Sequence, residues 1–154
     1  MQLIRRAWKD LASAHGTCEH IPQAMAGLGD KSASVRQAAR WKIDNYVVLQ
    51  GDLYEGAPWV ASELLKMLRR GDLPDRCIVI DLLLEFALGS ADGGSIPTSL
   101  GPLSLDLATK RVIADGLDVF EAEQVMGGAS AVLAQQVVEE IEGWRQDGVI
   151  PLSS

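Results

Sequence analysis

The sequence predicts an all-α protein of about seven helices, and three observations predict it. Apolar residues recur at three- and four-residue steps in stretch after stretch, which is the spacing of an amphipathic helix. Gly and Pro fall between these stretches, where helices end and begin. No stretch alternates apolar and polar residues for long, and no Asn-Gly or Asp-Gly turn joins two alternating stretches, so no sheet is expected.

The first two helices are predicted at the N-terminal end. LIRRAWKDLASA, residues 3–14, places Leu3, Ala7, Trp8 and Leu11 on one face. HIPQAMAGLG, residues 20–29, is a shorter helix with Pro in its first turn, where the missing N–H costs nothing. A Gly at its end closes it.

The clearest helical pattern covers residues 34–50, SVRQAARWKIDNYVVLQ. Ser32 or Ser34 is placed to cap its start, and Gly51 follows its end. Trp41 falls on the far side from the inner stripe, with Val48 in line with it. The predicted inner stripe consists of Val35, Ala38, Ala39, Ile43, Tyr46 and Val47.

Four further helical regions follow. Residues 57–71 end at a Gly, and residues 75–89, capped by Asp72 or Asp75, are apolar enough to be central and well buried. Residues 90–102 form the longest stretch rich in Gly, Pro and Ser and are predicted to be a loop. A helix over 105–127, broken or bent at Gly116, leads to the last helix, 130–148.

Length and composition restrict the class of protein. The 154 residues predict one domain, residues 1–154, and 47% apolar residues suffice for a core. The chain has no apolar run of about 18 residues, so no membrane association is expected. Lys9 and Asp10 interrupt any signal-peptide core, and Cys18 and Cys77 fit free, reduced thiols. We therefore expect a cytoplasmic protein.

The charge is unevenly distributed. Residues 1–70 hold ten Lys and Arg against seven Asp and Glu, whereas residues 71–154 hold four against fourteen. Phosphate contacts need clustered Lys and Arg, so nucleic-acid binding is not expected. The acidic half favours a partner with a basic surface. The alternative is an acidic surface that serves solubility alone.

The stretch AHGTCEHIP, residues 14–22, contains both histidines of the chain. His15, Cys18 and His20 could supply three zinc ligands, but no second cluster with ligand spacing exists. A Cys–His nucleophile pair would need an orienting group and an oxyanion site, and no catalytic motif accompanies it. We interpret the stretch as a turn between two helices, with Gly16 as the residue after a helix end. No enzyme activity, metal or cofactor is expected.

One helical pair resembles a HEAT repeat. In GDKSASVRQAARWKI, residues 29–43, the matching positions are Asp30, Val35, Arg36 and Ala39. Asp30 would hold the preceding loop, and Ala39 would allow two helices to approach closely. The pairs 57–70/74–89 and 105–127/130–147 would be two further, degenerate repeats. The resemblance implies a short α-solenoid, whose stacked helices form an extended binding surface.

A narrower resemblance covers most of residues 8–89. The strings WKDLASAHG, IPQAMAGL, VRQAA and LQGDLYEGA are similar to a group of small bacterial HEAT-like proteins found beside polymorphic toxins. This resemblance implies an immunity protein that binds and neutralises a cognate toxin. The alternative is a HEAT-type adaptor or scaffold for another protein partner.

The candidate partner-binding residues are acidic or aromatic. Asp and Glu on a helical array would pair with Lys and Arg of a basic toxin, and an exposed Trp would serve as an anchor. The alternative places every Trp in the core and every acid on a solvated face. The candidates are Trp41, Trp59, Asp106, Asp115, Asp118, Glu121, Glu139, Glu140 and Glu142. Glu123 falls in the same acidic stretch.

Overall fold

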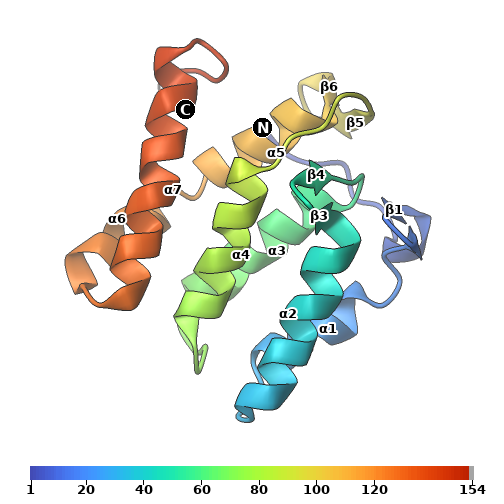
Figure 1. Cartoon of the computed structure of the whole chain (residues 1–154). Coiled ribbons are helices and arrows are strands. Elements are labelled where there is room, and N and C mark those ends of the chain that lie inside the picture. The colour runs from blue at the N-terminus through green and yellow to red at the C-terminus, as the bar shows by residue number, and fades with distance from the viewer. Residues whose placement is uncertain (153–154) are drawn as a thin grey trace.

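Seven α-helices and three short antiparallel hairpins make up the computed structural model, which describes residues 1–152 (Figure 1). The mainly helical class agrees with the prediction. No helix in this range is both long enough and apolar enough to cross a membrane. The helices are α1 (Ile21–Leu28), α2 (Ala33–Val47), α3 (Ala57–Arg70), α4 (Arg76–Leu88), α5 (Leu105–Ala114), α6 (Leu117–Met126) and α7 (Ala129–Gln146).

Side-chain caps and glycines set the helix ends. The Ser32 hydroxyl accepts a hydrogen bond from Val35 N at 3.4 Å, and the Asp75 carboxylate accepts one from Cys77 N at 3.0 Å, as predicted. Gly71 ends α3 with a φ of 76°, a left-handed conformation that favours glycine. The predicted break at Gly116 is confirmed, because α5 ends before it and α6 begins after it.

Consecutive helices pack as pairs. The helix α1 packs against α2, α3 against α4 and α6 against α7, while α4 also packs against α7. In Figure 1, α2, α4 and α7 lie side by side in the layer nearer the viewer, and α1, α3 and α6 lie behind them. The buried apolar side chains form one continuous cluster that extends from Leu11 to Ile150.

The close approach of α1 and α2 depends on two small residues. A Cβ added at Gly27 would lie 2.8 Å from the Cβ of Ala39, which is buried as predicted. Gly27→Ala is therefore expected to lower the free energy of unfolding by about 1–2 kcal/mol, even after the gain in helix propensity. The measurement is urea unfolding followed by circular dichroism.

Gly143→Ala is the matched control for this substitution. Apart from its chain neighbours and the backbone of its own helix, an added Cβ there meets no atom of the described residues within 4 Å. Because the residue lies inside α7, the change should raise stability by about 0.5–1 kcal/mol. Equal effects of the two substitutions would contradict the close helix approach.

The predicted N-terminal helix is wrong. Residues 8–10 form only a 3-10 turn, η1 (Trp8–Asp10), followed by β1 (Ala12–Ser13) and β2 (Gly16–Thr17). The preceding segment is extended and lies along β5 (Ser95–Thr98), where Ser99 N donates to Gln2 O at 2.8 Å. A short isolated helix is marginal in water, so this backbone pairing outweighs its amphipathic pattern.

Two further hairpins contradict the expectation of no strands. The helix predicted to residue 50 ends at Val47, and β3 (Val48–Leu49) pairs with β4 (Asp52–Leu53). Gln50 and Gly51 between them both have positive φ, the geometry of a tight hairpin turn. The predicted loop 90–102 contains β5, which pairs with β6 (Gly101–Ser104) and buries Ile96.

Candidate functional site

The two histidines lie on one aromatic side chain rather than around a metal position. His15 sits in the turn of the β1–β2 hairpin, with its ring centroid 5.2 Å from that of Tyr46. His20 lies 4.1 Å from the same ring, and its Nε2 is 2.9 Å from the carbonyl oxygen of Lys42. Within residues 1–152, no group of three or more His, Cys, Asp and Glu is placed to hold a metal ion.

Cys18 is poorly suited to be a nucleophile. It is fully buried, and its Sγ lies 3.7 Å from the carbonyl oxygen of Ala12. Burial, with a smaller contribution from the charge of Glu55, raises the pKa of its thiol to about 11. A thiol with this pKa is protonated at neutral pH and therefore unreactive. The stretch 14–22 is a turn, as predicted, but it belongs to a β-hairpin and not to a helix end.

The two candidate tryptophans differ in exposure. Trp41 on α2 is 59% exposed, as the sequence predicts for the far side of that helix. Trp59 on α3 is only 8% exposed, and its indole Nε1 donates a hydrogen bond to the carbonyl oxygen of Ile4 at 3.1 Å. The expectation of an exposed Trp59 is wrong, because the extended N-terminal segment covers it.

Three of the candidate aspartates lie near α5 and the start of α6. Asp106 accepts a hydrogen bond from Ala91 N at 3.2 Å and pairs with Lys110 at 2.5 Å. Asp118 pairs with Arg69 at 2.9 Å, and the carbonyl oxygen of Asp115 accepts from the same guanidinium at 3.1 Å. These contacts join parts of the fold, so Asp106 and Asp118 are only partly free for a partner.

The candidate glutamates of α6 and α7 are more open. Glu121, Glu139 and Glu142 are exposed, and Glu140 is half-buried. None of the four forms a salt bridge with another of the described residues. Glu123 lies inside instead, where it binds Arg76 and the hydroxyl of Ser130, so it does not belong to a solvated face.

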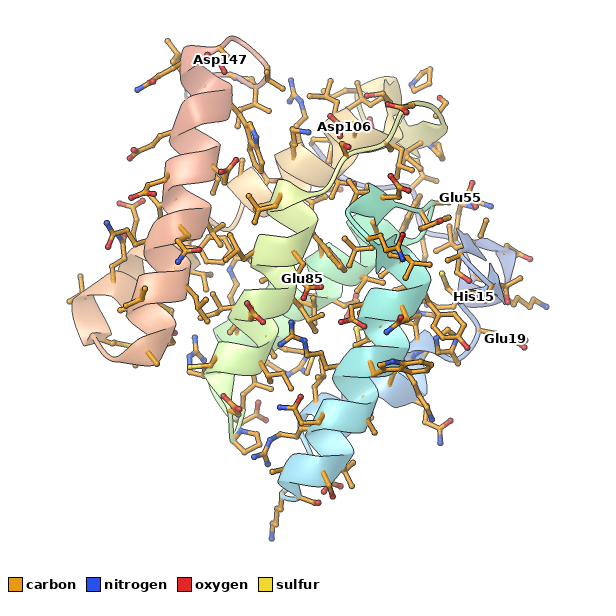
Figure 2. All side chains as sticks on the ribbon, viewed as in Figure 1. His15, Glu19, Glu55, Glu85, Asp106 and Asp147 are labelled. Carbon is orange, nitrogen blue, oxygen red and sulfur yellow. The ribbon has the colours of Figure 1, made fainter. Side chains whose placement is uncertain are left out.

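A cluster of charged side chains that are not among the sequence-predicted site residues lies between α2 and α4. The guanidinium of Arg40 contacts Asp81 at 2.6 Å and Glu85 at 2.5 Å, both on α4. Its Nε lies 3.9 Å from Asp44 on its own helix. Figure 2 shows Glu85 in the space between the two helices. One cation thus faces three carboxylates, which leaves two negative charges uncompensated.

The electrostatics of this cluster follow from its partial burial. Burial raises the pKa of Asp44, and the charge of Asp81 raises it further, against the lowering effect of Arg40. Burial also raises the pKa of Glu85, with contributions from the charges of Asp44 and Asp81. The ionised forms of both carboxylates are therefore destabilised in the folded protein, and an additional cation nearby would stabilise them.

An open groove lies directly beside the cluster. Its volume is about 510 Å³, and it is lined by Asp44 and Glu85 together with apolar side chains at the ends of α2 and α4. Leu88, at the end of α4, is 62% exposed and forms part of the lining. The groove has the size of a binding site for a side chain or a small group of side chains.

A second cavity, of about 710 Å³, lies beneath the N-terminal segment and against α3. It is lined by four cations, but carboxylates in or beside the cavity balance their charge, so it selects no particular ligand charge. The cations are Arg5, Arg6, Lys66 and Arg69, and the carboxylates are Glu55, Glu63, Asp115 and Asp118.

One signal in the sequence could have drawn attention to the groove. Arg40 and Asp44, and likewise Asp81 and Glu85, stand four residues apart and so share a helix face. Which helix faces which partner is decided only by tertiary packing. Comparison with protein-family models, with curated proteins and with solved structures finds no significant match.

Proposed function

We propose that this protein is a non-catalytic, protein-binding module whose partner carries a basic surface. Its most specific form is a cytoplasmic immunity protein that binds and neutralises a cognate toxin. The observation that carries the proposal is the groove between α2 and α4, beside which three carboxylates share Arg40 as their one ion-pairing cation within residues 1–152. Such an excess of negative charge destabilises the folded protein, and the cations of a partner would reduce that destabilisation.

The arrangement of the helices supports a HEAT-like interpretation. Two of the three suggested repeats have a packed helix pair, α1–α2 and α3–α4, whereas the first helix suggested for the third repeat, 105–127, is divided into α5 and α6, of which α6 packs against α7. Their second helices stand side by side in Figure 1 and would form one binding face. Trp41 lies on the first of these helices, where an exposed Trp suits the centre of an interface.

Exposed apolar side chains elsewhere also favour a protein partner. Val125 and Met126 at the end of α6 are exposed, as is Val132 on α7. Val125 lies four residues after the exposed Glu121 and so shares a face of α6 with it. Apolar residues rimmed by charge are common in protein interfaces.

The test is direct binding to the product of a neighbouring toxin gene. We expect a dissociation constant of about 1 nM or lower and loss of toxin activity at equimolar ratio. A purified toxin that shows no binding and keeps its activity in an excess of this protein would contradict the immunity function. An adaptor or scaffold role predicts instead a partner that is not a toxin, and the genomic neighbourhood separates the two.

Charge reversal on α7 provides a second prediction. Glu139→Lys with Glu142→Lys should slow association with a basic partner by about tenfold at low salt and less at high salt, because both side chains are exposed. Stopped-flow fluorescence measures the rate. Gln135→Ala on the same helix is a control that leaves the charge unchanged. A rate independent of these charges would exclude the α7 face from the encounter.

A further inference from the structure

The groove between α2 and α4 has two unlike walls. Leu88 and the partly exposed Leu49 supply apolar surface beside the buried Val48, whereas Asp44 and Glu85 supply carboxylates. An arginine side chain has the matching halves, because its alkyl stem packs on apolar surface and its planar head pairs with carboxylates. A lysine ammonium is a more strongly hydrated point charge and fits such a planar site less well.

The protein itself contains an example of this recognition. The guanidinium of Arg40 is bound by Asp81 and Glu85 on the neighbouring helix. Arg40 contacts one oxygen of Glu85, Oε1, and approaches only one oxygen of Asp44, Oδ2, at 3.9 Å. The other oxygen of Asp44, Oδ1, accepts a hydrogen bond from Asn45 Nδ2 at 2.8 Å. Each carboxylate oxygen has two lone pairs, so both groove-lining carboxylates keep acceptor capacity for a second guanidinium.

Trp41 lies on the α2 face that leads to the groove. Asn45, which lines the groove, donates a hydrogen bond from its side chain to the carbonyl oxygen of Trp41 at 3.1 Å. Residues four apart on a helix are neighbours on one face. Trp41 is thus one helical turn before the groove, and its exposed indole is available to a guanidinium of the same bound peptide.

From these contacts we propose that the α2–α4 groove binds an arginine side chain of the protein partner. The inference rests on the proposed function and names the chemical group that the α2–α4 groove recognises on the partner. The stem lies along Val48, Leu49 and Leu88, and the head pairs with Asp44 and Glu85. The excess negative charge of the cluster is complementary to the positive charge of the guanidinium.

The test uses two synthetic peptides, hexa-arginine and hexa-lysine, with the full chain. Binding is followed at physiological salt by the amide and indole NMR signals of the protein. We expect hexa-arginine to shift signals of α2, α4 and the Trp41 indole, and to bind about tenfold more tightly than hexa-lysine. Equal affinities of the two peptides, or shifts confined to other helices, would overturn the inference.

Two double variants with the same change in charge make the test specific. Asp44→Asn with Glu85→Gln alters the groove, and Glu139→Gln with Glu142→Gln alters the exposed face of α7. The groove variant should weaken hexa-arginine binding about tenfold and the α7 variant less than about twofold. Equal weakening by the two double variants would mean that hexa-arginine binding depends only on the net charge of the protein. Thermal unfolding shows that both variants are folded.

The same variants separate this inference from the proposed function. If a basic protein partner binds the wild type but loses no affinity for the groove variant, the arginine site is contradicted and the protein-binding function stands. If no basic partner binds but hexa-arginine still maps to the groove, the proposed function fails and the arginine site stands.

Trp41→Ala should weaken hexa-arginine binding by about three- to fivefold, which reports the stacking contribution.

Discussion

Glu123→Ala is expected to lower the free energy of unfolding by about 3 kcal/mol, because it breaks an ion pair whose carboxylate is buried. The side chain is 1% exposed. Its carboxylate accepts a hydrogen bond from Arg76 Nε at 2.5 Å and another from the hydroxyl of Ser130 at 2.9 Å. Its removal leaves the guanidinium of Arg76, on α4, with a carbonyl oxygen of Leu68 as its only other partner among the described residues.

This ion pair joins α4 to the α6–α7 pair, so its loss should also loosen the packing of the last two helices. Hydrogen exchange of α6 and α7 amides would show that effect, and urea unfolding gives the free energy. Glu121→Ala on the same helix is the matched control, since that side chain is exposed and should change stability by less than about 0.5 kcal/mol. A Glu123→Ala variant as stable as this control would contradict the buried pair.

Arg40→Ala is the second large effect, with an expected loss of about 2 kcal/mol at pH 7. Its removal leaves Asp44, Asp81 and Glu85 close together without a cation. Breaking a buried pair costs about 3–5 kcal/mol, and the partial exposure of these groups reduces that figure. Lys42→Ala removes the same charge from an exposed position of the same helix and should cost less than about 0.5 kcal/mol.

The pH dependence of this loss has a definite sign. Burial raises the pKa of Asp44 and of Glu85 in the folded protein, so the folded state binds protons more tightly than the unfolded state. Their contribution to stability is present below the ordinary pKa and is lost as the pH rises through the raised value. Without Arg40 both values rise further, so the difference between variant and wild type should grow from about pH 4 to pH 7. A difference independent of pH would contradict the cluster.

The helices were predictable because their signals are local. Repeated apolar residues, Ser32 and Asp75 as caps and Gly116 as a break placed α1 to α7 within a few residues of their observed ends. The apolar face of α7 is buried, including Ala134, Val137 and Ile141, which recur at three- and four-residue steps. On α2 the prediction succeeds for Ala39, Ile43 and Val47 but is wrong for Val35 and Ala38, which are exposed.

The candidate site was predictable only in part. The sequence indicates an exposed Trp41 and open glutamates on α7, and the structure places these side chains at the surface. It could not exclude Trp59, since the segment that covers that indole was itself predicted to be a helix. It also missed Asp44, Asp81 and Glu85, because no spacing along the chain brings two helices into contact.

By itself, the sequence determined that the chain is mainly helical and that its negative charge lies toward the C-terminal end. Both properties depend on the order of residues alone, through helical periodicity and the count of charges. Only the tertiary structure decided that the first residues pair with a distant hairpin, that Glu123 is internal and that Arg40 faces three carboxylates. These outcomes depend on which surfaces meet in the folded chain, where the energy of packing and desolvation outweighs local preference.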